Sequence, residues 1–333
     1  MKCKENIRIA FVGTGNIAVQ HMKYLSMFSD VEISGLYDIN EDILRTRRYE
    51  FGGETYNSID KMLDTLEPDA VFICVPPYAH GEAELACIER SVPFFVEKPL
   101  SNDLTLAKNI AHTVGCSDII TAVGYMNRYR HGVQKARNLL KSHPVTLIHG
   151  AWLIGTPINH LWLTQKKLSG GQLIEQTTHL FDLIRYLCGE VSSIHCYGAK
   201  GFIQLTSTYD TEDASGVLIQ LESGAVASVI SSWSSGLEHS IYLRLFGPDI
   251  YIEFDDWEFD TKIIMRERSY PLEIPGEKNI FAIEDRAFID AVKYNDPSGI
   301  LSDYEDGVRS LELSFAANES LETGKPVHIT QFR

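Results

Sequence analysis

A glycine turn near the start of the chain is the feature that most constrains its fold. An apolar, β-branched run at Ile7–Val12 leads directly into GTGNIA at residues 13–18, and a helical pattern continues to Leu25. In this GxGxxA arrangement the first glycine permits a tight turn, the second lets the backbone approach a pyrophosphate, and Ala18 lets the helix pack closely on the strand. The pattern predicts a dinucleotide-binding strand–turn–helix; the alternative is a glycine turn in an α/β protein that binds no nucleotide.

The residues after this turn indicate which dinucleotide it holds. Asp38 lies 20 residues beyond Ala18, at the end of the next apolar run, Val31–Tyr37. A carboxylate there accepts hydrogen bonds from the adenosine ribose hydroxyls and repels a 2′-phosphate, so we expect NAD in preference to NADP. Arginines on the next predicted helix weaken this preference, because one of them can reach a phosphate. The arginines are Arg45, Arg47 and Arg48, and the expected contacts in the turn itself are Gly13, Gly15, Asn16 and Ile17.

Strand and helix patterns alternate in the first third of the chain. Short apolar runs at Ala70–Val75, Pro93–Val96 and Ile119–Val123 are separated by helical segments. This alternation predicts a doubly wound parallel sheet of the Rossmann type, covered on both faces. Beyond it, strand patterns follow one another with turns at residues 222–224 and 247–248, which predicts an α+β domain with a large, mostly antiparallel open sheet.

Length and composition limit the remaining classes. The 333 residues suit two domains, since one domain usually has about 100–200 residues, and we place them at 1–123 and 124–333. The net charge of −15 argues against nucleic acid or an anionic membrane as a general partner. Six scattered cysteines form no CxxC pair, and we find neither a secretion signal nor an apolar run of roughly 18 residues. We expect a cytoplasmic protein.

Two further segments carry candidate chemistry. Lys98 follows the predicted strand Pro93–Val96, so it points toward the crevice outside the carboxyl ends of the strands, unless it is an ordinary surface residue. On a predicted helix, Gly171–Leu187, the spacing of Glu175, His179 and Asp182 places all three on one face. That face is a solvated surface, a metal site or a site for an organic substrate; we favour the last and expect no metal.

Taken together, these motifs resemble the Gfo/Idh/MocA oxidoreductases over essentially the whole chain. The motifs are, in order, GTGNIA at 13–18, VPPYAH at 75–80, EKPLS at 97–101, AVGYMNRY at 122–129 and SGGQLIEQTTHLFDLIRYLCG at 169–189. The resemblance implies a Rossmann domain, a second α/β domain whose open sheet serves for oligomerisation, and a nicotinamide cofactor at the domain crevice.

The resemblance also implies roles for individual residues. Lys98 matches the family's catalytic lysine and His179 its catalytic histidine, while Glu175 stands where many members have an aspartate. That glutamate keeps the acid function on an arm one methylene longer. Further cofactor contacts are expected at Val75, Pro76, His80, Glu97 and Lys98. Substrate contacts are expected at Asn127, Arg128, Glu175 and His179, with Trp162 and Lys166 added from a polar loop suited to packing on and bonding a sugar.

The expected function is hydride transfer between NAD and a secondary alcohol of a sugar, cyclitol or related polyol. Lys98 is the first choice for the group that takes the hydroxyl proton, and His179 is the second. Two alternatives stay open: a glycoside hydrolase that keeps its NAD bound, and a regulator without catalysis that binds a dinucleotide. We expect a homodimer or homotetramer formed through the C-terminal sheet.

Overall fold

The structure, a computed structural model, describes residues 6–157 and 161–329. Its internal packing divides the chain into two compact units. The first runs to Met126 and also includes Asn279–Val308, and the second contains Asn127–Lys278 and the residues from Arg309 onward. The sequence expectation had placed 279–308 in the second domain. The segment groups with the first unit because Phe288 and Ile289 are fully buried in that unit's core.

A parallel sheet forms the centre of the first unit. Its strands are β1 (Ile7–Val12), β2 (Val31–Tyr37), β3 (Glu54–Tyr56), β4 (Ala70–Ile73), β5 (Phe94–Val96) and β6 (Thr121–Val123). They lie in the order β3-β2-β1-β4-β5-β6, and all neighbours are parallel. The strand order reverses its direction between β1 and β4, which is where ligands bind in doubly wound folds.

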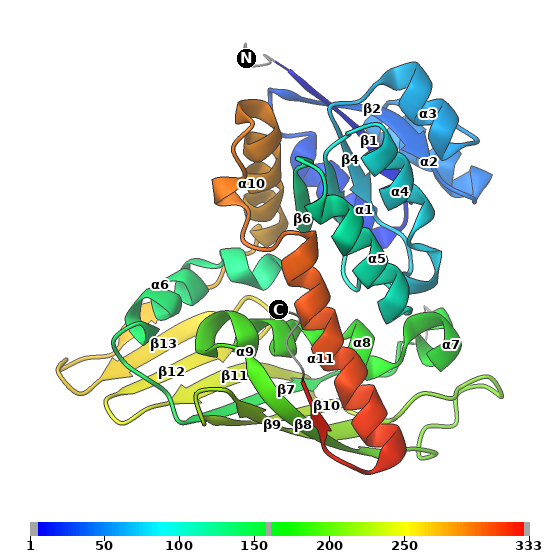
Figure 1. Ribbon diagram of the computed structural model, residues 1–333. Coiled ribbons are helices and arrows are strands. Elements are labelled where there is room, and N and C mark those ends of the chain that lie inside the picture. The colour runs from blue at the N-terminus through cyan, green and yellow to red at the C-terminus, as the bar shows by residue number, and fades with distance from the viewer. Residues whose placement is uncertain (1–5, 158–160, 330–333) are drawn as a thin grey trace. The chain divides into compact units, whose positions relative to one another are not determined.

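Helices cover this sheet, as Figure 1 shows. They are α1 (Asn16–Leu25), α2 (Glu41–Phe51), α3 (Ile59–Leu66), α4 (Glu82–Glu89), α5 (Leu104–Gly115) and α10 (Ile280–Tyr294), with 3₁₀ turns η1 (Pro77–Ala79) and η4 (Pro297–Gly299). Side-chain caps begin several of them: the Asn40 carboxamide oxygen, for example, accepts from the amides of Asp42 and Ile43 at the start of α2. α10 packs beside α1, so the returning C-terminal segment helps to cover the same sheet.

A second, larger sheet forms the base of the second unit. Its strands are β7 (Leu147–Leu153), β8 (Val191–Ala199), β9 (Ala214–Leu221), β10 (Val226–Ser232), β11 (Ser240–Phe246), β12 (Ile250–Asp255), β13 (Asp260–Met265), β14 (Leu272–Ile274) and β15 (Val327–His328). They lie in the order β14-β13-β12-β11-β7-β10-β9-β8-β15. Among the described strands of this second sheet, only β7 and β10 are parallel neighbours, and the other neighbours are antiparallel. The hairpins β9–β10 and β11–β12 turn where the sequence predicts.

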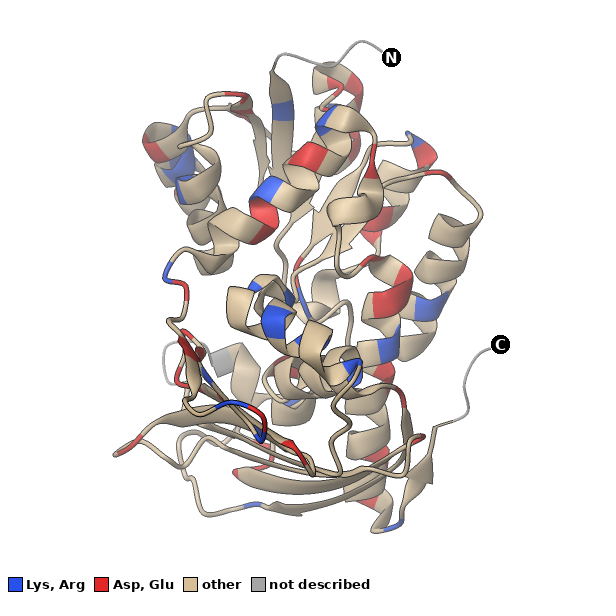
Figure 2. Cartoon of the chain, turned by 90° about the vertical axis from the view of Figure 1, so that its left-hand side faces the viewer, with Lys and Arg blue, Asp and Glu red and all other residues tan. Residues whose placement is uncertain are grey.

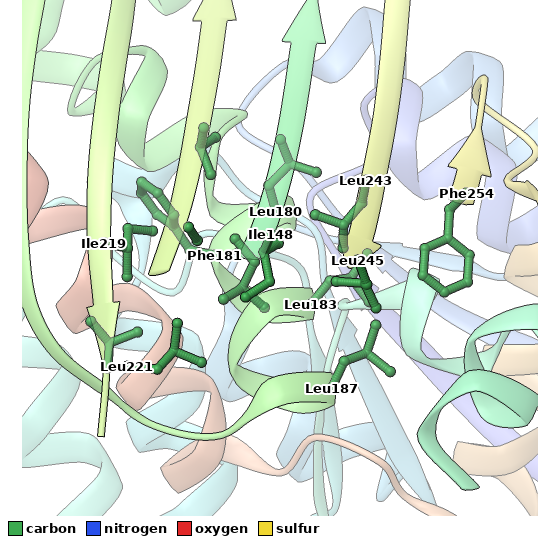
Figure 3. Packing of buried hydrophobic residues seen from close by; sticks show 14 of the residues in the cluster. Ile148, Leu180, Phe181, Leu183, Leu187, Ile219, Leu221, Leu243, Leu245 and Phe254 are labelled. Carbon is green, nitrogen blue, oxygen red and sulfur yellow. The ribbon is translucent and has the colours of Figure 1, made fainter. Parts of the chain in front are cut away.

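Helices cover one face of this sheet. They are α6 (His131–Leu140), α7 (Lys166–Ser169), α8 (Gln172–Glu175), α9 (Thr178–Cys188) and most of α11 (Tyr304–Thr323), with η2 (Met126–Tyr129) and η3 (Leu161–Thr164) as short turns. In Figure 3 the apolar side chains of the strands face those of α9: Ile219 lies beside Phe181, and Leu243 lies beside Leu180. The fold class expected from the sequence is therefore confirmed for both units. In the part of the chain that the structure describes, no helix has the length and apolarity needed to cross a bilayer.

The helix expected over Gly171–Leu187 is broken in two, which corrects the sequence analysis. α8 ends at Glu175 and α9 begins at Thr178. Side chains near the break bond to the sheet instead of leaving the helix continuous: the Gln176 carboxamide oxygen accepts from the Trp233 indole N–H at 2.7 Å, and the Thr177 hydroxyl donates to the Ser231 hydroxyl at 2.8 Å. The Thr177 hydroxyl also reaches the carbonyl of Gln172, a competition that interrupts helices.

Candidate functional site

The glycine turn has the shape that a bound pyrophosphate requires. Gly13 has φ +83°, and a Cβ built on it would lie 2.3 Å from the carbonyl oxygen of Cys74, just beyond the end of β4. A Cβ on Gly15 would meet no described atom within 4 Å, so the backbone there is open to a ligand. α1 starts at Asn16 without a side-chain cap, which leaves its first amides to be satisfied by something other than the helix. The turn therefore fits a dinucleotide phosphate.

Asp38 stabilises this turn through hydrogen bonds. Its Oδ2 accepts from the amide of Thr14 at 2.7 Å and from the Thr14 hydroxyl at 2.9 Å, while its Oδ1 accepts from the amide of Asn40 at 2.8 Å. The side chain is partly exposed, and each oxygen retains acceptor capacity beyond these bonds. The geometry thus agrees with a carboxylate that holds the turn and also accepts from a ribose.

Two of the three arginines that follow Asp38, Arg45 and Arg47, already have protein partners. The Arg47 Nε donates to the Thr14 carbonyl at 3.1 Å, and its Nη1 pairs with Glu50 at 2.7 Å. Arg45 forms an ion pair with Asp42. Arg47 therefore contacts the glycine turn by donating to its backbone, and its charge is paired with Glu50.

Two more predicted cofactor segments lie at the same edge of the sheet. Val75 follows β4 and lies so near the glycine turn that a Cβ on Gly13 would be 2.9 Å from its Cγ1; Pro76 is the next residue and precedes η1. His80 differs from expectation, because its side chain is fully buried and its Nδ1 lies 2.6 Å from the Glu84 carboxylate. Glu84 also accepts from the amide of Gly81, so this pair fixes the loop from within.

Lys98 comes shortly after the end of β5, directly after Glu97, and its side chain is partly exposed. Its amide donates to Glu97 Oε2 at 3.1 Å, and the Lys98–Pro99 peptide bond is cis. Glu97 is buried, and a Cβ on Gly124 would lie 2.8 Å from its Oε1. The glutamate predicted as a cofactor contact is therefore packed inside the unit, while the lysine beside it is accessible.

In the second unit His179 lies on the first turn of α9 and is buried. The Trp152 indole, near the end of β7, stacks on its ring with centroids 5.0 Å apart and an interplanar angle of 14°. Trp257 meets Trp152 edge-on, with ring centroids 6.1 Å apart. Glu175 is partly exposed at the end of α8. Because the helix break lies between them, Glu175 and His179 do not lie one turn apart on a single regular helix, contrary to the sequence prediction.

The two residues predicted near the substrate at the start of this unit, Asn127 and Arg128, bind other side chains of the same unit. Arg128 is buried and donates through Nε and Nη2 to both oxygens of Asp182, at 2.9 and 2.5 Å. Asp182 also accepts from the Ser310 hydroxyl. Asn127 is buried as well, and its carboxamide oxygen accepts from Arg130 Nε at 2.7 Å. Asp182 therefore pairs with Arg128, and Arg185 pairs with Glu190.

The polar loop residues have different surroundings. Trp162 lies in η3 with a partly exposed side chain. The Lys166 ammonium pairs with Glu322 of α11 at 2.9 Å, so its charge already has a partner in the same unit. No group of three or more metal-ligating side chains suited to an ion occurs among the described residues.

Two notable residues escaped the sequence analysis. His21 is fully buried on α1 between two carboxylates, and its position three residues after the tightly packed Ala18 is the signal that it faces inward. Trp152 stacks on His179, and nothing in its local sequence shows which ring it meets.

The Gly13 geometry yields a direct test of the turn. Substituting Gly13→Ala adds a Cβ that collides with the Cys74 carbonyl at positive φ, so the turn must move. We expect the dissociation constant for NAD, measured by calorimetry, to rise by at least about tenfold, because the backbone amides that would bind the phosphate lose their alignment. Gly224→Ala is the control, because Gly224 also has positive φ but a Cβ there meets no described atom within 4 Å. Equal NAD affinity in the two variants would contradict a phosphate-binding role for this turn.

Two family models match this chain, one in its N-terminal part and one in its C-terminal part. The family described as "Oxidoreductase family, NAD-binding Rossmann fold" matches residues 7–125, and the GFO/IDH/MocA C-terminal domain matches residues 133–253. The chain is 25% identical to a myo-inositol 2-dehydrogenase of Thermotoga maritima, with 98% of this chain and 99% of the relative covered. It is 26% identical to an NAD⁺-dependent scyllo-inositol 2-dehydrogenase of Bacillus subtilis, with 98% and 97% covered.

Solved structures share the fold. Levoglucosan dehydrogenase in complex with NADH and levoglucosan superposes with a TM-score of 0.87 at 20% identity, covering 98% of this chain and 100% of that one. GenD2 of gentamicin A biosynthesis, in complex with NAD, gives 0.85 at 21% identity, covering 99% and 98%. Both family matches, in this order and over most of the sequence, lead to one conclusion: the chain belongs to the Gfo/Idh/MocA family of oxidoreductases and carries its NAD-binding Rossmann domain.

Proposed function

We propose that this protein is an NAD-dependent dehydrogenase that oxidises a secondary alcohol of a cyclitol or sugar, or reduces the corresponding ketone. The observation that carries the proposal is the place of Lys98. It emerges at the carboxyl end of β5, at the same edge of the parallel sheet from which the glycine turn and Asp38 emerge after β1 and β2. The two inositol 2-dehydrogenases that align over almost the whole chain support a cyclitol as the first substrate to test.

In the proposed reaction the Lys98 amine takes the proton of the reacting hydroxyl. NAD, when bound, accepts the hydride from the carbon, so that the alcohol becomes a ketone and one proton is released. His179 is the second candidate for proton transfer, or it holds the reacting hydroxyl in place. Its stacking on Trp152 restricts the ring to one plane, which suits either role. Glu175 orients a neighbouring hydroxyl.

Two of the expected substrate contacts have protein partners of their own. Arg128 pairs with Asp182 and Lys166 with Glu322, so our proposal gives neither a direct contact with substrate charge. Asn127, Trp162, Glu175 and His179 remain the proposed substrate-side residues. The cofactor side comprises the glycine turn, Asp38, Val75, Pro76 and Lys98.

The function is tested by a screen of NAD reduction over inositol isomers, aldoses and sugar acids, with analysis of the products. We expect NADH to form in proportion to ketone with at least one cyclitol or sugar. Release of free sugar from a glycoside without net NADH would identify the retained-cofactor hydrolase instead. Binding of NAD with no turnover of any alcohol or glycoside would favour the regulator.

Substituting Lys98→Met tests the proposed base. Methionine keeps the length and apolar stem but cannot accept a proton, so turnover should fall by about 10²–10⁴ while the affinity for NAD stays within about threefold. Lys61→Met on α3, an exposed lysine far along the sheet from β5, is the matched control and should keep full activity. Full activity in Lys98→Met would refute the assignment.

We further propose that the protein is a homo-oligomer, formed through the face of the large sheet that its helices leave uncovered. Along β9 Leu221 is buried against the helices whereas Leu218 is 62% exposed on the opposite face. Apolar residues on neighbouring strands share that exposure; they are Leu147, Tyr197, Val226, Ile230 and Ile264. Figure 2 shows few charged residues along these strands. An apolar patch of this kind suits a second copy of the same sheet.

A charge placed on this face should dissociate the assembly. Leu218→Glu is expected to reduce the mass measured by light scattering to that of a smaller species, because a buried carboxylate without a partner is costly. Leu237→Glu, at a fully exposed leucine outside the strands, should leave the mass unchanged. A monomeric wild-type protein, or an unchanged mass in Leu218→Glu, would rule out this interface.

The thiols support a cytoplasmic location as part of this proposal. The described cysteines are free, and burial raises the pKa of Cys74, Cys188 and Cys196 above the ordinary range. Such thiols are inert packing groups in a reducing compartment.

A further inference from the structure

A buried histidine of the first unit has a partner at each ring nitrogen. His21 lies on α1 with none of its surface exposed. Its Nδ1 is 2.7 Å from Asp285 Oδ1 on α10, and its Nε2 is 3.0 Å from Glu97 Oε1 beside Lys98. The aromatic rings of Phe72, Phe95 and Phe281 surround the imidazole, with centroids 5.1 to 5.5 Å away, and exclude water from it.

This arrangement favours the protonated form of the ring. A neutral imidazole has one N–H donor and one acceptor, but both nitrogens of His21 face carboxylate oxygens, which accept. With two ionised carboxylates, only the imidazolium satisfies both contacts. Burial alone would lower the pKa of His21, but the charges and hydrogen bonds of Asp285 and Glu97 outweigh it and raise the pKa well above its ordinary value.

The histidine also restricts the segment that carries Lys98. One oxygen of Glu97 bonds to His21, and the other accepts from the amide of Lys98 at 3.1 Å. On its remaining side the carboxylate lies against Gly124, where a Cβ would come within 2.8 Å of it. These contacts hold the Glu97 carboxylate in place, and the amide of Lys98 is tied to it by a hydrogen bond.

We infer that His21 is an imidazolium that bridges Glu97 and Asp285 and, through Glu97, positions Lys98 for its reaction. His21 is thus a positioning residue, not a catalytic one. The consequence for catalysis rests on the proposed function, whereas the bridge itself does not. It links three segments that are far apart in the sequence: the helix after the glycine turn, the end of β5 and the returning helix α10.

The protonation is tested on the protein without NAD or substrate. In long-range ¹H–¹⁵N spectra of histidine-labelled protein, the His21 signals are those that disappear in His21→Gln. We expect both ring nitrogens to have imidazolium shifts from pH 6 to pH 8, with the titration displaced to lower pH in Asp285→Asn and in Glu97→Gln. The Cys74 thiol also lies close enough to this bridge to interact with Glu97 and Asp285, and Cys74→Ala should leave the pattern unchanged. A neutral tautomer at pH 7, with the proton on Asp285, would overturn the inference.

The positioning role is tested by amide exchange in the same protein. We expect His21→Gln and Asp285→Asn to accelerate exchange of the Lys98 amide by at least about tenfold, because its acceptor becomes mobile. Asp30→Asn is the matched control. Asp30 anchors the same helix α10 through Arg286 and Lys293, at 2.8 and 2.6 Å, without touching Glu97. It should lower thermal stability while leaving exchange at Lys98 unchanged.

Turnover provides the last measurement. Asp285→Asn should lower kcat by about tenfold or more with little change in the KM for NAD, whereas Asp30→Asn should keep kcat within about twofold. The double variant His21→Gln/Asp285→Asn should be no slower than His21→Gln alone, because both remove one bridge. Equal effects of the two Asp→Asn changes on exchange and on kcat would reduce His21 to a stability role and overturn the inference. If no alcohol is oxidised at all, the proposed function fails, while the spectra and the exchange rates still decide on the bridge.

Discussion

Parallel hydrogen bonding between neighbouring strands determines where the candidate site of the first unit lies. β1 pairs with β2 on one side and with β4 on the other, and β5 continues the sheet beyond β4. Because these strands run in one direction, their carboxyl ends meet at one edge. Residues that follow different strands, Gly13, Asp38 and Lys98, are thereby gathered from separate parts of the sequence. The chemistry of the site depends on this register more than on any single contact within it.

Elements with strong local signals were predictable from the sequence. β1 and β2 have the expected bounds, because the apolar runs that form them are encoded within each segment. The three-residue strand β3 had no such signal, since its extended state depends on pairing with β2. The break between α8 and α9 was missed for a related reason: its bonding partners, Ser231 in β10 and Trp233 just after it, come more than 50 residues later in the sequence.

Residue types at the site were predictable, but their partners were not. The sequence marks Arg128 and Asp182 as polar residues in family motifs, yet only the fold shows that they bind each other across 54 positions. A polar side chain that meets a ligand and one that meets an internal partner have the same local pattern. His21 is the extreme case, because its two partners lie 76 and 264 positions away.

Asp285 lies far along the sequence from most of the first unit, and this distance affects when the His21 contacts can form. His80 and its carboxylate Glu84 are neighbours in the sequence, so that pair forms wherever the local loop forms. His21 gains its second carboxylate only after the chain has passed through Asn127–Lys278 and returned as α10. A buried imidazolium with one partner missing is costly. The edge of the sheet that carries Lys98 therefore acquires its final geometry only when the returning segment has packed, which makes the NAD-binding unit dependent on residues that the sequence places far from it.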